Sequence, residues 1–157
     1  MARGVRGGES ALVVCFDNTP EDVVSALTEG PGLSSSKVAS DVGIVNASVN
    51  DVSLGDRFRV FDIDSPADLT GVGMRIGKEL DGLADEDGRV RVLYDSISTA
   101  LMYRDGKTVY KFLRKAVGDC VGRGALVIAL LDTGIPEEYE EERILGIFDG
   151  DVEFRSE

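Results

Sequence analysis

The chain has 157 residues, and its 29 Asp and Glu outnumber 17 Lys and Arg, which gives a formal net charge of −12. Hydrophobic residues make up 43%, which excludes a disordered acidic tail. The absence of histidine excludes a Ser-His, Cys-His or His-metal site within this chain, and two cysteines are too few for a disulfide framework. The acidic balance argues against direct binding of nucleic acid, whose phosphates need basic surface. No apolar run is long enough to span a membrane.

The acidic residues are mostly Asp, and only five of the 17 cations are Lys. Such a composition is typical of proteins that work in molar salt, where a Debye length of about 3 Å makes self-repulsion cheap. The N-terminal residues lack the apolar core of a signal peptide. We therefore expect a cytoplasmic protein of a salt-in halophilic archaeon, with an ordinary acidic protein as the alternative.

The first half of the chain alternates strand and helix patterns. Leu12 to Phe16 is an apolar run of strand length. Thr19 is suited to cap a following helix, because Pro20 occupies its first position and two acidic residues follow. Val42 to Val45 predicts a short strand, and Arg57 to Ile63 a weaker one.

The second half continues the alternation. Ser65 to Asp68 predicts a helix start, and apolar residues keep helical spacing from Leu69 to Leu83. Val90 to Tyr94 predicts a strand, and Val109 to Cys120 carries the clearest amphipathic stripe. Ala125 to Leu131 is apolar throughout, which is typical of a strand buried on both faces.

The C-terminal residues predict two further features. Pro136 opens a short acidic helix that runs through Arg143, and its Glu137 to Glu142 patch is most simply a solvated helix face. Ile144 to Phe148 and Val152 to Phe154 then predict a closing β-hairpin around Asp149 and Gly150.

Alternating strands and helices favour an α/β fold of three layers, with a mostly parallel sheet and helices on both faces. No linker or internal repeat divides the chain. We expect a single domain over residues 1–157, with residues 1–10 as a flexible N-terminal arm.

Two segments together resemble the RecA/KaiC-like ATPase superfamily, in particular its haloarchaeal KaiC-like and gas-vesicle-regulator-like branch. Gly8 to Val24 looks like that family's second strand and following helix. Arg91 to Ser98 looks like its Walker B strand, in which apolar residues end in Asp-Ser. The resemblance implies a RecA-like core, and it makes Asp95 and Ser96 the Walker-B-like residues.

The chain departs from that family at the phosphate loop, whose glycine amides, Lys and Ser or Thr hold nucleotide phosphates and magnesium. The nearest segment, Gly71 to Glu79, has the wrong spacing, and Glu79 stands in place of the magnesium ligand. The same residues fit an amphipathic helix with Val72 and Ile76 facing inward. The resemblance thus implies a core that lacks the P-loop strand and helix.

The catalytic position departs as well. The family's paired glutamates align with Asp17 and Asn18, and an asparagine cannot serve as a general base. Asp95 would help place magnesium, but it has no phosphate loop to work with. Its simpler reading is a carboxylate at a strand end, next to a helix capped by Ser96 or Ser98.

Two other groups of residues have a functional and a structural reading. Asp62, Asp64 and Asp68 could bind a divalent cation through oxygen ligands, although helix capping explains them equally well. Cys15 and Cys120 lie on apolar patterns and are expected to be buried and inert. We predict no metal site and no catalytic residue.

The missing P-loop strand would leave unpaired backbone or exposed apolar surface, unless the sheet closes differently or another chain covers it. We expect a non-catalytic, pseudo-ATPase regulatory or scaffolding module that binds a protein partner or itself as a homodimer. It would need no cofactor and bind no membrane. The alternative is a nucleotide-dependent ATPase or switch whose phosphate loop comes from another chain or from an upstream segment. ATP and magnesium belong only to that alternative.

Overall fold

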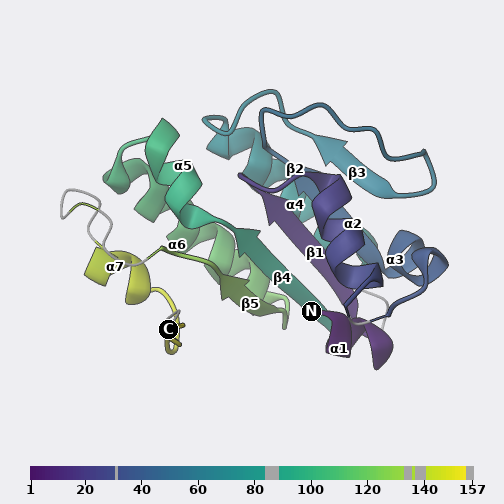
Figure 1. Ribbon diagram of the computed structural model, residues 1–157. Coiled ribbons are helices and arrows are strands. Elements are labelled where there is room, and N and C mark those ends of the chain that lie inside the picture. The colour runs from purple at the N-terminus through teal and green to yellow at the C-terminus, as the bar shows by residue number, and fades with distance from the viewer. Residues whose placement is uncertain (31, 84–88, 133–135, 137–140, 155–157) are drawn as a thin grey trace.

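The computed structural model describes residues 1–30, 32–83, 89–132, 136 and 141–154. Five strands and seven helices lie in these ranges (Figure 1). In chain order they are α1 Ala2–Arg6, β1 Ser10–Cys15, α2 Pro20–Thr28, α3 Ser35–Asp41, β2 Val42–Asn46, β3 Arg59–Asp62, α4 Leu69–Leu83, β4 Val90–Asp95, α5 Ile97–Tyr103, α6 Gly106–Gly122, β5 Leu126–Ala129 and α7 Glu141–Leu145.

The strands form one parallel sheet in the order β3-β2-β1-β4-β5. The expected three-layer α/β fold is therefore confirmed. The register places Cys15 beside both Asn46 and Asp95, so the carboxyl ends of the three central strands meet at one edge. β1 pairs with β2 on one side and β4 on the other, so the sheet is continuous across its centre and β3 and β5 are its edge strands.

Local signals explain where the helices start. Thr19 caps α2 in a capping box with Asp22, and Pro20 is its first residue, as the sequence predicts. Asp105 caps α6 by accepting a hydrogen bond from the Thr108 backbone N–H at 3.0 Å. These caps satisfy backbone donors that would otherwise have no partner in the first turn.

Helices cover the two faces of the sheet unequally (Figure 1). One face, which includes Leu12, Val92 and Tyr94, packs against α4, α5, α6 and α7 in a single large core. The other face, which includes Val13 and Ile44, packs against α1, α2 and α3 in a smaller core. Figure 1 shows α2 in front of β1, whereas β4 and β5 face the viewer with α6 behind them.

Three expectations need correction, and two of them concern the ends of the chain. The predicted closing hairpin does not form, since Glu141–Leu145 is helix and Val152 to Phe154 forms no strand. The reason is that Ile144 is fully buried against the large core from one side of a helical turn. The N-terminal segment is not a free arm, because α1 packs on the smaller core through buried Val5.

The third correction concerns the apolar segment from Ala125 to Leu131. Its strand, β5, is at the edge of the sheet, half-buried on one face and exposed on the other. An unbroken apolar run predicts burial on both faces, but whether a helix covers each face depends on distant parts of the chain. Within the described residues, no helix combines the length and apolar character needed to cross a lipid bilayer.

Glu79 in α4 is a buried carboxylate that pairs with two partly exposed arginines. Its side chain is 6% exposed, and its oxygens lie 3.3 Å from Arg59 Nη2 and 3.1 Å from Arg75 Nη2. Arg75 also stacks on the ring of Phe61, 3.5 Å from its centroid. Glu79 therefore joins α4 to the outer strand β3.

We predict that Glu79→Ala lowers the free energy of unfolding by about 2–3 kcal/mol, because two arginines lose their buried carboxylate. Chemical denaturation in high salt measures this change. The exposed neighbour Lys78 is the matched control, and Lys78→Ala should change stability by less than about 0.5 kcal/mol. Equal effects of the two substitutions would contradict the structural role of Glu79.

Both cysteines are buried, as expected. Burial raises the pKa of the Cys15 thiol to about 12, with the Asp95 and Asp22 carboxylates nearby adding to the effect. Burial also raises the pKa of Cys120, whose Sγ lies 3.9 Å from the Tyr94 hydroxyl.

We predict that neither cysteine reacts with a disulfide reagent in the native protein at pH 8, because the reactive thiolate of Cys15 forms only as the pH approaches about 12. Both should react in denaturant. A thiol titration with and without denaturant measures this, and rapid native labelling of either cysteine would contradict the burial described here.

Candidate functional site

The crevice between β1 and β4 is the natural place for a site in this fold. From β1 the chain proceeds to β2 and β3 on one side, and β4 leads to β5 on the other. Ligands of open α/β sheets bind at such a switch point, outside the carboxyl ends of the strands. Asp17 and Asn18 directly follow β1, Asp95 ends β4, and Ser96 follows it. All four residues predicted from the sequence therefore lie at this edge.

The structure joins two of these residues directly. The Asn18 Nδ2 donates a hydrogen bond to Asp95 Oδ2 at 2.5 Å. Asp17 is exposed. Ser96 is the N-cap of α5, and its Oγ accepts the Thr99 backbone N–H at 3.4 Å. Asp95 is thus a carboxylate that accepts a hydrogen bond from a side-chain amide, and Ser96 is the N-cap of the helix that follows it.

The same arrangement recurs one strand further along the edge. The Asn46 Nδ2, at the end of β2, donates to Asp62 Oδ1 at the end of β3, at 2.8 Å. The Asn46 Oδ1 accepts the Ser48 hydroxyl at 2.7 Å. Asp95 and Asp62, which each end a strand, therefore both accept a hydrogen bond from an asparagine side chain of the same protein. Nothing in the sequence pattern indicated the Asn46–Asp62 bond, because it depends on the register of β2 and β3.

The N-terminus of α2, which opens onto this edge, is occupied by its own side chains. Asp22 Oδ2 accepts hydrogen bonds from the Thr19 backbone N–H at 3.0 Å and from the Thr19 hydroxyl at 2.7 Å. These bonds hold the pKa of Asp22 below its ordinary value. A phosphate at this position would meet a carboxylate where phosphate-binding folds present free N–H groups.

The segments that the sequence offers as candidates for binding phosphate or a metal ion have structural roles. Gly71 to Glu79 lies inside α4, so these residues form no loop. Asp68 Oδ1 accepts the Gly71 backbone N–H at 2.8 Å, so Asp68 caps this helix. Throughout the ranges that the structure describes, no three acidic or cysteine side chains gather in a way that could hold a metal ion. Asp62 accepts a hydrogen bond from Asn46 and Asp68 caps α4, so hydrogen bonding within the chain accounts for these two carboxylates.

An apolar pocket of about 230 Å³ lies below the Asn18–Asp95 bond, between α2 and the sheet. Asn18, Asp22 and Asp95 form its polar rim. Its walls come from the N-terminus, β1, α2 and β4: Met1, Val13, Val23, Ala26, Leu27 and Leu93. The predicted polar residues thus form the rim of a hydrophobic pocket, which sequence reasoning missed.

Beyond this pocket, one side of β5 is exposed. Leu93 pairs in register with Ile128, so the two side chains share a face of the sheet. On that face Leu126, Ile128 and Leu130 are exposed by 52%, 37% and 42%. We call the surface formed by Leu93, Leu126, Ile128 and Leu130 the open face. Alternate exposure of this kind could not be read from the sequence, because every residue from Ala125 to Leu131 is apolar.

The pocket and the open face form one apolar surface that starts at the Asn18–Asp95 bond and ends at the outer strand. Its chemistry suits apolar side chains, and its rim offers one amide and two carboxylates. No lysine or arginine is among the described residues that line the pocket.

No curated protein matches this chain. A family model described as "Family of unknown function (DUF7504)" matches residues 2–154. The match covers α1, the whole sheet and α7, so the open face and the strand-end amide bonds lie within the region that defines the family. The chain therefore belongs to the DUF7504 family.

Proposed function

We propose that this protein is a non-catalytic, pseudo-ATPase relative of the RecA/KaiC-like proteins, a regulatory or scaffolding module that works by binding protein through its open face. The observation that carries the proposal is the uncovered apolar stripe on β5, which continues into the pocket beside α2. Large apolar side chains gathered on one surface are typical of protein-binding sites.

The residues at the carboxyl edge of the sheet support the proposal that the protein is non-catalytic. Asn18 stands where a general base would be needed, and its amide cannot take a proton from water near neutral pH. The same amide donates a hydrogen bond to Asp95, which is the carboxylate that a magnesium ion would use in the related ATPases. The capped N-terminus of α2 adds a further negative charge nearby. These features together oppose the binding of a nucleotide phosphate.

A second copy of the chain is the partner that we propose for the open face. The open faces of two copies have the same chemistry and size. A dimer with twofold symmetry uses the same surface on both subunits, so the open face alone could form its interface. In molar salt the repulsion between two chains of net charge −12 is strongly screened. The pocket of about 230 Å³ can accept an apolar side chain from the partner as an anchor.

The alternative is a nucleotide-dependent switch whose phosphate loop comes from another chain. One observation favours it, namely that Asp95 lies at the switch point of the sheet, where α/β proteins bind ligands. The two proposals differ in whether ATP with magnesium stabilises the fold.

We predict that millimolar ATP, ADP or GTP with magnesium leaves the thermal unfolding temperature unchanged in multimolar KCl, relative to magnesium alone. A ligand at a hundred times its Kd would add about 2.7 kcal/mol of stability and give a clear shift. A rise that requires ATP and disappears in Asp95→Asn would refute the non-catalytic proposal and support the switch.

We predict that the wild-type chain is a dimer in multimolar KCl by light scattering, and that Ile128→Lys produces a monomer that remains folded. The new ammonium would have to be buried against the partner, which is costly. Val121→Lys is the matched control, since Val121 is 57% exposed on α6 and lies away from the open face. This control should remain dimeric. A monomeric wild-type protein would exclude self-association through the open face.

A further inference from the structure

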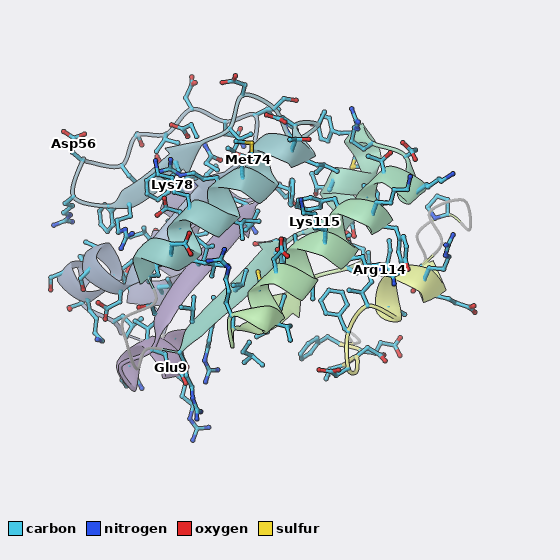
Figure 2. All side chains as sticks on the ribbon, turned by 180° about the vertical axis from the view of Figure 1, so that it is seen from behind. Glu9, Asp56, Met74, Lys78, Arg114 and Lys115 are labelled. Carbon is cyan, nitrogen blue, oxygen red and sulfur yellow. The ribbon has the colours of Figure 1, made fainter. Side chains whose placement is uncertain are left out.

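A second surface lies on the opposite side of the sheet, in the groove between α4 and α6. Figure 2 shows this side, with Met74 on α4 and Lys115 on α6 labelled on the two neighbouring helices. The groove has a volume of about 520 Å³. Its floor is apolar and includes Ile76, Leu80 and Phe112. The groove lies outside the switch-point crevice and has no part in the function proposed above.

Glycines keep this groove open. Gly73 and Gly77 line it from α4, one helical turn apart. A Cβ added at Gly77 would meet no atom within 4 Å, and one at Gly73 would only touch Phe112 at 3.6 Å. An alanine would therefore fit at both positions, and it would stabilise the helix by about 1 kcal/mol relative to glycine. Packing within the chain therefore does not explain why glycine stands there. Met74 on the same rim is 74% exposed, and its flexible side chain suits an adaptable contact.

Positive charge is concentrated on the other wall of the groove. Lys111 and Lys115 lie about one helical turn apart on α6, and Lys107, one turn earlier, does not line the groove. Lys111 and Lys115 line the groove together with Arg104. Within the part of the chain that the structure describes, these three lining cations form no salt bridge.

The negative groups around the groove are few and partly engaged. Asp68 caps α4 through its bond to Gly71, and Asp119 lies on α6 one turn beyond Lys115. At the far end, Arg123 is paired with Asp81 and is therefore partly neutralised. The excess positive charge thus gathers toward Arg104, Lys111 and Lys115, on a protein whose net charge is −12.

We propose that the groove between α4 and α6 binds an acidic amphipathic helix of a partner protein. Charge complementarity selects the partner, because unpaired cations line the groove of an otherwise acidic chain. The apolar stripe of such a helix would cover the floor, and acidic residues spaced four apart would match Lys111 and Lys115, about 6 Å apart along their helix.

The groove favours a helix over other anionic partners. Backbone groups of α4 and α6 bond within their own helices, so no strand can be added by main-chain hydrogen bonds. Nucleic acid would need a denser array of cations than this groove offers, and it would not use an apolar floor. The open spaces at Gly73 and Gly77 let the backbone of a second helix approach closely.

A display library of amphipathic helices tests the proposal. Each member is about 18 residues long, roughly 27 Å, and has a fixed leucine stripe with flanking positions varied among Asp, Glu, Lys, Arg and Ser. Selection uses the full chain at the lowest KCl concentration that keeps it folded. We expect enriched members to carry acidic residues spaced four apart. Enrichment of neutral or basic flanks would overturn the proposal.

Variants then locate the binding of an enriched peptide, measured by fluorescence anisotropy. Lys111→Glu with Lys115→Glu should weaken it at least tenfold, and Gly77→Leu should do the same by filling the groove. The control, Lys78→Glu with Arg114→Glu, makes the same change in net charge at two exposed cations outside the groove and should alter the Kd less than twofold.

Two outcomes would overturn the proposal at this stage. One is an equal loss of affinity in the control, which would mean that only overall charge matters. The other is tighter binding of a 20-base-pair DNA duplex than of the peptide, which would make the surface a nucleic-acid site. Ile128→Lys should leave peptide binding unchanged, so a failure here is separate from a failure of the open-face proposal.

Discussion

A parallel sheet is built from strands that are apolar on both sides, and each side must be covered to keep it from water. In this protein the direction of each crossover decides which side receives a helix. Right-handed connections place α4 and α6 on one face, because both precede a step toward β5. The step from β1 to β2 runs the other way and places α2 and α3 on the opposite face. That opposite face is consequently covered over β1 and β2 but left open over β4 and β5.

The position of α7 completes this asymmetry. Buried Ile144 joins the same core as Tyr94, so α7 packs beside α6 and does not cross to the open face. Leu126, Ile128 and Leu130 therefore remain exposed in the single chain. The proposed binding function follows from this arrangement of helices, since the apolar residues themselves are unremarkable for a strand.

The carboxyl edge of the sheet and the groove behind it differ in how their charges are satisfied. At the edge, Asp95 and Asp62 accept hydrogen bonds from Asn18 and Asn46, so the carboxylates are engaged within the chain. In the groove, Lys111 and Lys115 line apolar surface without a salt bridge in the described residues. An engaged polar edge suits a structural role, whereas unpaired cations beside an apolar floor suit a partner of opposite charge.

The sequence by itself determined the elements whose signals are local. Thr19 and Pro20 set the start of α2, and the spacing of apolar residues from Leu69 to Leu83 predicted α4, although this helix begins at Leu69 and not within Ser65 to Asp68. It also placed Asn18 and Asp95 at the ends of two strands, because a strand end is marked by the change from apolar to polar residues. Neighbouring residues carry all of this information, since helix caps and periodicity act within a few turns.

Only the tertiary structure decided which of these elements meet. The Asn18–Asp95 bond requires β1 and β4 to be neighbours, although 77 positions separate the two residues. Exposure of Ile128 depends on where the described helices pack, since none of them covers its side of β5, and the groove at Lys111 depends on the packing of α4 beside α6. An apolar run or a row of lysines reads the same in either setting, because burial is a property of the neighbours that the fold brings together.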